Sequence, residues 1–311
     1  MLANYRNSGT PEIFVAENFH ATDHTSMSPL QIFILAVVQG LAELLPVSSS
    51  AHVVVAEKLL GLDPSSPPMT LLLVMLHTGT MFAVIAYFWR TWRKTYFQSV
   101  TAFRTFAAQV IVATLLTAAV GGGVTLLIES TILAGAPQAQ IEDLFSHLEF
   151  ISPALGAAGI LILLAGILTR HRAARTDDLS RWQSAMIGAV QGLCLPFRGF
   201  SRSGATISTG MLFGVSRRRV EAFSFALAVV LTPPVIVRET WRLLHANAFS
   251  GSTDIRSAVA FGLLGALIAF VAGLAALKWL SRWLETDRWY LFGIYCLGAA
   301  LVTAYLYVAG Y

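Results

Sequence analysis

The residues in this sequence best suited to chemistry surround one arginine, Arg202, inside an otherwise apolar stretch. The polar and small residues beside it are Ser201, Ser203, Gly204 and Thr206. An arginine at the depth of a hydrophobic span is costly unless it meets an anionic partner. A guanidinium pairs with a phosphate through two parallel hydrogen bonds. Ser203, near the N-cap of a following helix, would add backbone N–H groups that favour anions. This stretch predicts a phosphate site inside a membrane protein.

A second candidate cluster lies in the first half of the chain and begins with Gln39 and Glu43. These residues are four apart, so they share one face of a helix. A carboxylate within an apolar run is a functional candidate. Glu43 would orient His52 or hold a divalent cation between phosphate oxygens. The other interpretation is that Glu43 pairs with an arginine only to hold the fold, and the two roles overlap if the partner is Arg202.

Three serines and a histidine complete this cluster: Ser48, Ser49, Ser50 and His52. We predict that Ser49 attacks phosphorus, that Ser48 and Ser50 help to bind phosphate, and that Ser50 also caps the next helix. His52 follows Ser49 by three residues, on the same helix face. There it would take the Ser49 proton or protonate the leaving group. His52 as the nucleophile and a metal-bound water are alternatives that the sequence leaves open.

The cluster around Arg202 would supply most of the phosphate contacts. Phosphoryl transfer depends mainly on positioning and on neutralising the charge that builds on the equatorial oxygens. Arg202 would provide the charge, and its neighbours would provide hydrogen-bond donors: Ser201, Ser203, Gly204 and Thr206. Arg198 either contacts phosphate or faces water. We interpret His77, which lies alone in an apolar run, as a packing residue or a hairpin contact.

The two clusters occupy corresponding places in an internal repeat. Residues 38–41 and 190–193 both read VQGL, and each is followed by a polar tip and a second short apolar run. This is the pattern of a broken, re-entrant hairpin. Paired broken segments in two halves indicate the binding site of a repeat-built membrane protein.

Composition indicates the fold class. Of the 311 residues, 56% are hydrophobic and only 12% are charged, whereas soluble domains carry about 25% charged residues. We predict an all-α integral membrane protein with six transmembrane helices plus two re-entrant helical hairpins in an inverted-topology repeat. A kink or early stop is expected at Pro233-Pro234. The predicted spans are Met69–Trp89, Thr105–Ile128, Ile151–Thr169, Val220–Val237, Ala258–Leu277 and Trp289–Val308.

The predicted organisation is one membrane domain after a polar tail. The tail lacks the basic start and apolar core of a signal peptide, and Met27 marks an alternative start. The predicted parts are the tail at 1–28, the membrane domain at 29–311, a first repeat at 29–181 with its hairpin at 30–62, and a second repeat at 182–311 with its hairpin at 182–215.

Charge predicts the orientation. Three spans separate the two hairpins, and an odd number inverts the second relative to the first. The loops at 90–104, 170–181, 216–219 and 278–288 hold 14 of the 21 lysines and arginines. The positive-inside rule places these loops in the cytoplasm and both termini outside. The hairpins would then enter from opposite sides, and their tips would meet near the middle of the protein.

These motifs resemble the bacterial undecaprenyl-diphosphate phosphatase family of the bacitracin-resistance type. Gln39 and Glu43 fit its (E/Q)xxxE motif. The segment 46–52 is similar to its PVSSxxH element, and the segment 199–206 matches its PGxSRSxxT signature except at the first position. The resemblance runs from about Met27 to the C-terminus. It places six residues on the family's active-site positions: Glu43, Ser49, His52, Ser201, Arg202 and Thr206.

The resemblance implies hydrolysis of undecaprenyl diphosphate to the monophosphate, which recycles the lipid carrier of cell-wall synthesis. It also implies help from Mg²⁺ or Ca²⁺, a location in the bacterial inner membrane, and an active site that faces the periplasm. The chain departs from the family at two positions. Arg198 stands where the signature has proline, and Gln39 replaces a glutamate found in many members, which removes one charge near the predicted cation.

The expected partners are lipids. We expect undecaprenyl diphosphate as substrate and membrane lipids as surroundings, with no nucleic acid and with a homodimer left open.

The competing function is a flippase or transporter of polyprenyl-phosphate lipids without hydrolysis, because inverted repeats with broken helices also build transporters. A transporter has no need of Ser49 beside His52 and opposite Arg202. A membrane scaffold without a ligand would leave Glu43 and Arg202 unexplained. Fold-level analogy alone does not decide between a phosphatase and a transporter, but the motif residues favour the phosphatase.

Overall fold

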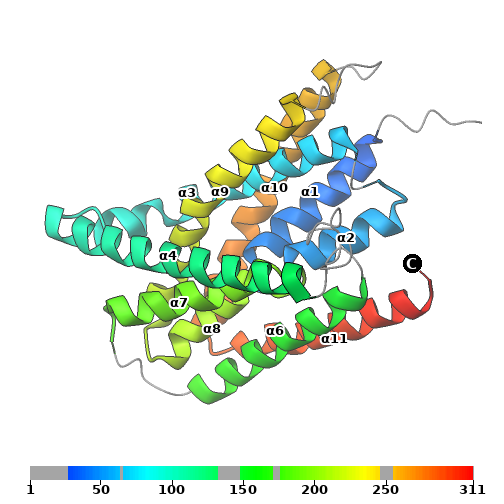
Figure 1. The fold of residues 1–311 in the computed structure, drawn as a ribbon. Coiled ribbons are helices and arrows are strands. Elements are labelled where there is room, and N and C mark those ends of the chain that lie inside the picture. Colours follow the sequence, from blue (N-terminus) through cyan, green and yellow to red (C-terminus); the bar gives the residue numbers. More distant parts are fainter. Residues whose placement is uncertain (1–26, 64–65, 132–147, 171–175, 246–254, 311) are drawn as a thin grey trace, which may run out of the picture.

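The fold, given by a computed structural model, confirms the all-α class. It describes residues 27–63, 66–131, 148–170, 176–245 and 255–310. Regular structure in these residues is helical, apart from an isolated parallel bridge between Thr176 and Val215. The helices in Figure 1 are α1 (Pro29–Leu44), α2 (Ser49–Leu59), α3 (Pro67–Thr95), α4 (Val100–Thr131), α6 (Leu148–Thr169), α7 (Arg181–Cys194), α8 (Arg202–Leu212), α9 (Arg217–His245), α10 (Ile255–Glu285) and α11 (Trp289–Val308). The predicted polar tail lies almost entirely outside the described residues.

Six of these helices are long and apolar enough to cross a membrane: α3, α4, α6, α9, α10 and α11. The six predicted spans are therefore confirmed, and the last has the predicted bounds. The other five begin or end beyond the predicted apolar segment. In α3, for example, the helix continues through Arg93 and Lys94, because charged residues at the end of a span can extend into the polar interface. The chain is a multi-pass membrane protein.

The predicted early stop at Pro233-Pro234 is wrong. α9 continues through both prolines to His245. Each proline removes its own N–H bond and crowds the carbonyl four residues earlier, and membrane helices tolerate this where other groups satisfy the freed carbonyls. Just before the prolines, Thr232 Oγ1 donates to the Ala228 carbonyl oxygen at 2.7 Å. This side-chain bond adds a hydrogen bond to the turn that leads into the prolines.

The two short helix pairs, α1 with α2 and α7 with α8, are closed by matching contacts. Each first helix begins with a capping box, formed by Ser28 and Gln31 in α1 and by Ser180 and Gln183 in α7. Each glutamine also donates to the C-cap carbonyl of its partner helix, at 3.3 Å in the first pair and 3.2 Å in the second. The internal repeat is thus longer than the VQGL match.

The glycines of the repeat bring each short pair against a long helix of the other half. A Cβ on Gly40 would lie 2.7 Å from the Ala269 carbonyl oxygen in α10. A Cβ on Gly192 would lie 2.7 Å from the Thr117 carbonyl oxygen in α4. Since a carbon atom does not fit at these distances, the close packing requires glycine. Each short helix pair therefore packs against a long helix from the other half of the repeat.

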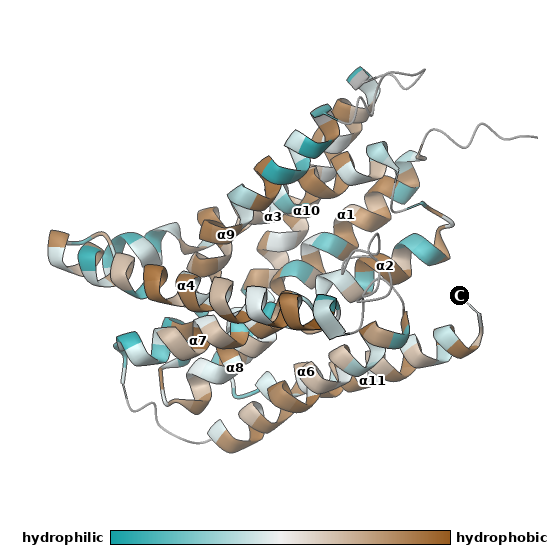
Figure 2. Ribbon diagram, in the orientation of Figure 1, coloured by the Kyte–Doolittle hydropathy of each residue, from teal (hydrophilic) through white to brown (hydrophobic). Residues whose placement is uncertain are grey.

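The long helices form the frame around these pairs. α6 lies along α11 and α3 packs on α10 (Figure 1). Hydrophobic residues predominate along the long helices (Figure 2). Leu115, Leu267 and Leu301 are exposed, as expected for surfaces that contact lipid tails rather than water. The helices of the short pairs have 11 to 16 residues, too few to span a bilayer. Their re-entrant position in the membrane stays a prediction.

Candidate active site

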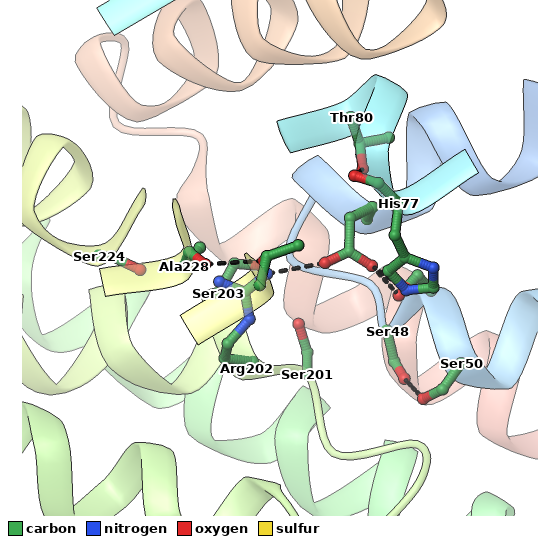
Figure 3. Close-up of polar contacts among 12 residues, drawn as sticks. Ser48, Ser50, His77, Thr80, Ser201, Arg202, Ser203, Ser224 and Ala228 are labelled. Atoms are coloured by element: carbon green, nitrogen blue, oxygen red, sulfur yellow. Dashed lines mark hydrogen bonds and ion pairs between the residues drawn. The ribbon is translucent and has the colours of Figure 1, made fainter. Parts of the chain in front are cut away.

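Two helix tips face each other at the centre of the protein. α2 begins at Ser49 and α8 begins at Arg202, with Ser48 and Ser201 as their N-caps. The N-cap of α8 is therefore two residues earlier than the predicted Ser203. Figure 3 shows the residues of the two tips on either side of a common space. Both helix N-termini can offer backbone N–H groups to an anion placed there.

The backbone of the first tip is strained. Ser48 has φ of +68°, a left-handed conformation that is unfavourable for a residue with a side chain. Ser48 occupies the N-cap position that we predicted for Ser50, yet its side chain does not cap α2. Its Oγ lies 3.2 Å from Ser50 Oγ instead. The N–H groups in the first turn of α2 therefore lack a side-chain cap and are available to a ligand.

Glu43, in the last turn of α1, joins the two tips. Its Oε1 accepts a hydrogen bond from Arg202 Nη2 at 2.8 Å, and the Glu43 side chain is only 16% exposed. Its Oε2 accepts hydrogen bonds from Ser49 Oγ at 2.6 Å and from Gln39 Nε2 at 3.3 Å. Four residues singled out from the sequence thus form one connected network.

His77 of α3 belongs to this network, although the sequence interpretation assigned it to packing or a hairpin contact. Its Nε2 lies 3.7 Å from Glu43 Oε2, and Figure 3 shows its ring reaching from α3 toward the two tips. A histidine within an apolar span was the available signal in the sequence. Its partner could not be inferred, because only the packing of α3 against α1 brings the two side chains together.

The tips enclose a cavity of about 280 Å³. Its polar lining residues are Glu43, Ser48, Ser49, Ser50, His77, Arg198, Ser201, Arg202 and Ser203. Arg202 Nη1 is buried and has no hydrogen-bond partner among the residues that the structure describes. Leaving a buried guanidinium nitrogen unsatisfied costs free energy. The Arg202 side chain as a whole is 22% exposed and lines the cavity, where a guanidinium can pair with a phosphate.

Two hydrogen bonds fix the tips relative to each other. Ser203 Oγ donates to the Leu45 carbonyl oxygen at 3.2 Å. The Gly199 N–H donates to Ser50 Oγ, also at 3.2 Å. Both bonds run from the second hairpin to the first. The cavity is therefore shaped by contacts between segments that are far apart in the sequence.

His52 faces away from this cavity. Its Nδ1 lies 2.7 Å from the Ser48 carbonyl oxygen, and because a carbonyl only accepts, Nδ1 carries the proton. Its Nε2 is then free to accept from the Tyr295 hydroxyl of α11 at 2.8 Å. The two rings also stack, with centroids 5.6 Å apart. The Ser49 hydroxyl donates to Glu43 rather than to the predicted base, His52.

Gly204 and Thr206, predicted to contact phosphate, do not line the cavity. The Gly204 N–H is donated to the N-cap side chain, and a Cβ here would lie 2.5 Å from Ile162 Cδ1 of α6. Thr206 is fully buried, donates to the Arg202 carbonyl oxygen at 2.8 Å and lies 2.6 Å from Ser224 Oγ of α9. Both residues instead pack α8, the helix that carries Arg202.

The side chains around the cavity do not make a complete metal site. Within the described ranges, no group of three or more His, Cys, Asp or Glu residues could hold a metal ion. Glu43 lines the cavity, and both of its oxygens already accept hydrogen bonds. This donor set fits only a cation that takes most of its ligands from substrate phosphates and water, as Mg²⁺ often does.

A helical multi-pass protein that gathers these groups at two facing helix tips can offer hydrogen-bond donors and one guanidinium to an anionic group between them. The fold places the chain among the helical integral membrane proteins. Among them, the chain belongs to the bacitracin resistance protein BacA family, whose family model matches residues 32–302.

Curated relatives cover nearly the whole chain. It is 57% identical over 275 residues to undecaprenyl-diphosphatase 2 of Acinetobacter baylyi, a match that covers 88% of this chain and 95% of that protein. It is 34% identical over 290 residues to the undecaprenyl-diphosphatase of Desulfosudis oleivorans, covering 90% and 99%. It is 30% identical over 282 residues to the undecaprenyl-diphosphatase of Rhodopirellula baltica, covering 89% and 97%.

Proposed function

We propose that the protein hydrolyses undecaprenyl diphosphate to undecaprenyl phosphate and inorganic phosphate. The observation that carries this proposal is the arrangement around Glu43. One of its oxygens holds Arg202, which lines the cavity, and the other oxygen accepts a hydrogen bond from the Ser49 hydroxyl. A phosphate binder stands beside a nucleophile and its base. The names of the relatives supply the substrate.

The chemistry follows from these contacts. Arg202 and the N–H groups of the α2 N-terminus bind the terminal phosphate and neutralise its charge. Ser49 Oγ attacks the terminal phosphorus while Glu43 takes its proton, the P–O bond to the inner phosphate breaks, and undecaprenyl phosphate leaves as an anion. After Glu43 has released its proton to solvent, it accepts a proton from the water that attacks the phosphoserine. As the P–O bond to Ser49 Oγ breaks, Glu43 passes this proton to Ser49 Oγ, which restores the hydroxyl and yields inorganic phosphate.

A divalent cation, Mg²⁺ or Ca²⁺, is part of the proposal. Glu43 would be its protein ligand, and the substrate phosphates and water would complete its coordination. When bound, such a cation supplies additional neutralisation of the phosphate charge. The residues of the chain still perform the positioning and the proton transfer.

We place the protein in the bacterial inner membrane, with the cavity open to the periplasm. The excess of basic residues in the loops assigned to the cytoplasm supports this orientation. The product is the lipid carrier that cell-wall synthesis requires. Recycling that carrier would also give resistance to bacitracin, in agreement with the family's description.

The test is phosphate release from undecaprenyl diphosphate by the purified protein in detergent. The wild type should release phosphate, and Arg202→Ala should not, with its helical content unchanged. No release by folded wild type with Mg²⁺, Ca²⁺ or neither would reject the hydrolase. Movement of the intact lipid across reconstituted vesicles would then become the activity to measure, because the paired repeats also suit a transporter.

A further inference from the structure

A groove of about 410 Å³ lies between α2 and α11, and the proposed chemistry does not use it. Its lining residues in α11 recur at helical spacing along one face: Tyr295, Gly298, Ala299, Val302 and Thr303. The rest of the lining consists of Ala51, His52 and Val55 of α2 and Leu155 of α6. Because these α11 residues lie near the middle of a helix that can cross the membrane, the groove lies at the depth of lipid tails.

The polar side chains of the groove are already bonded within the protein. His52 Nδ1 lies 2.7 Å from the Ser48 carbonyl oxygen, and His52 Nε2 lies 2.8 Å from the Tyr295 hydroxyl. Thr303 Oγ1 donates to the Ala299 carbonyl oxygen at 2.8 Å. Burying a polar ligand group costs free energy unless it gains a hydrogen bond. With its own polar groups occupied, the groove suits an apolar ligand.

The groove begins where the phosphate cavity ends. Ser49 and Ser50 line the cavity, and the next two residues of α2, Ala51 and His52, line the groove. About one helical turn, or 5.4 Å, therefore separates the two spaces along α2. The chain of a lipid diphosphate starts at its inner phosphate. A lipid whose phosphates occupy the cavity can therefore pass its first carbons directly into the groove.

Small residues on both walls give the groove its shape. A Cβ added to Gly298 would meet nothing within 4 Å, and Ala51 and Ala299 carry only a methyl group. These positions leave notches in the lining. An isoprenoid chain carries a methyl branch on every unit, whereas a straight acyl chain has none. Since packing drives the association of apolar groups within lipid, a notched groove favours the branched chain.

We infer that this groove binds the first isoprene units of the substrate's polyprenyl chain while the diphosphate occupies the cavity. The inference rests on the proposed function and deepens it, because it assigns a site to the part of the substrate that carries no phosphate. It also gives a place to His52, whose ring turns away from the phosphate cavity and lines the groove beside Ser48. The cavity reacts with the headgroup, and the groove selects the chain.

Binding of non-hydrolysable ligands tests the inference without turnover. Isothermal titration calorimetry would compare the Kd of methylenediphosphonate, which has no chain, with the Kd of its farnesyl ester, which carries a short isoprenoid chain. Gly298→Leu puts a branched side chain, similar in size to an isoprene unit, into the groove. It should weaken the farnesyl ester about tenfold, equivalent to about 1.4 kcal/mol, and should change the Kd of methylenediphosphonate by less than about twofold.

The matched control variant is Gly122→Leu in α4. A Cβ on Gly122 would also meet nothing within 4 Å, and α4 is also long and apolar enough to span the membrane. Because Gly122 lies outside the groove lining, both Kd values should match those of the wild type. The control ligand is the dodecyl ester, which has a straight saturated chain. Gly298→Leu should weaken the dodecyl ester less than the farnesyl ester.

Photocrosslinking tests the groove in the wild type, so the inference stays testable if Gly298→Leu does not fold. A farnesyl ester with a diazirine close to its headgroup should label residues within 51–55 of α2 or 295–303 of α11, as mapped by mass spectrometry. Label confined to other helices would overturn the inference. An unchanged Kd of the farnesyl ester in folded Gly298→Leu would also overturn it.

Equal weakening of the dodecyl and farnesyl esters by Gly298→Leu would reject the polyprenyl chain as the specific occupant. The groove would then hold any lipid chain. These outcomes differ from a failure of the proposed function. In that case the wild type would bind the farnesyl ester and label the groove but release no phosphate from undecaprenyl diphosphate.

Discussion

Ser49 Oγ and Glu43 Oε2 share a hydrogen bond of 2.6 Å across the tip of the first hairpin. The sharp turn between α1 and α2, with its strained Ser48, folds the start of one helix back onto the end of the other. The strain is consistent with a backbone shaped for function rather than for stability. A hydroxyl and a carboxylate at this distance can exchange a proton as the hydroxyl attacks phosphorus.

Substitution of either member of this pair should abolish most of the catalytic activity. We expect Ser49→Ala and Glu43→Gln each to lower kcat about 10³-fold or more, because nucleophile and base act as one unit. For the same reason the double variant should be no slower than the worse single variant. Steady-state phosphate release measures all three. Ser130→Ala, at an exposed position of α4, is the control and should match the wild type. If kcat of the double variant fell by the product of the two single-variant factors, the two residues would act separately.

Arg202 should need its planar guanidinium as well as its charge. Arg202→Lys keeps the charge, yet an ammonium cannot hold Glu43 and a phosphate in one fixed fork. We expect kcat/KM to fall about 10²-fold for Arg202→Lys, equivalent to the loss of one charged hydrogen bond or slightly more. The value for Arg202→Ala should be lower still, and its free energy of unfolding should fall because Glu43 loses its partner. A lysine variant with wild-type kcat/KM would contradict this account of the cavity.

The sequence predicted those parts of the site that depend on local spacing. The spacing of Gln39 and Glu43 and the pattern around Arg202 identified the central network, and the repeat predicted that the two tips meet. The direction of His52 could not be predicted in the same way. Ser49 is the first residue of α2 and turns back to Glu43, whereas His52 turns toward Tyr295 of α11. Only packing between distant helices decides that difference.

The limits of the fold prediction have the same origin. Apolar length identified all six spans, but the end of α9 depended on whether the helix continues through Pro233 and Pro234. The VQGL match identified the repeat, while the reason for its glycine became visible only when Gly40 and Gly192 were seen against the carbonyls of the opposite half. Sequence spacing describes one helix at a time, and these features arise between helices.

The repeat glycines should be essential for stability. Gly40→Ala and Gly192→Ala would each force a methyl group to 2.7 Å from a carbonyl oxygen, and overpacking of this kind costs about 1–3 kcal/mol. We expect both variants to unfold at a lower temperature in detergent. Gly122→Ala in α4 is the matched control, since a Cβ there meets nothing within 4 Å, and it should be as stable as the wild type. Stability of Gly40→Ala equal to that of this control would contradict the described packing.

His52 and Tyr295 should be coupled energetically. Their hydrogen bond of 2.8 Å joins α2 to α11, and a neutral hydrogen bond contributes about 1 kcal/mol. A double-mutant cycle with His52→Ala and Tyr295→Phe should give a coupling of about that size in the free energy of unfolding. Tyr295→Phe should also leave kcat within about tenfold of the wild type, because the residue borders α2 without touching the phosphate cavity. Purely additive effects on stability would show that the contact is absent in solution.

Gln39 should set the dependence on a divalent cation. Its amide donates to Glu43 Oε2 at 3.3 Å, so Gln39→Glu would place two carboxylates side by side. Like charges this close are unfavourable unless a cation lies between them. We expect Gln39→Glu to be less active than the wild type with a chelator present, and to regain activity when Mg²⁺ or Ca²⁺ is added. The ratio of activity with cation to activity with chelator should therefore be higher for Gln39→Glu than for the wild type. An equal ratio in the two proteins would show that Glu43 is not a cation ligand.

The central claim, that Ser49 attacks phosphorus with Glu43 as its base, is tested most directly by trapping the intermediate. Undecaprenyl diphosphate labelled on its terminal phosphate would be mixed with enzyme, quenched within one turnover, and the protein digested and mapped by mass spectrometry. The account predicts phosphate on Ser49 in the wild type and none in Glu43→Gln. Rapid phosphate release with no labelled Ser49 at any quench time would contradict it and make water the attacking group.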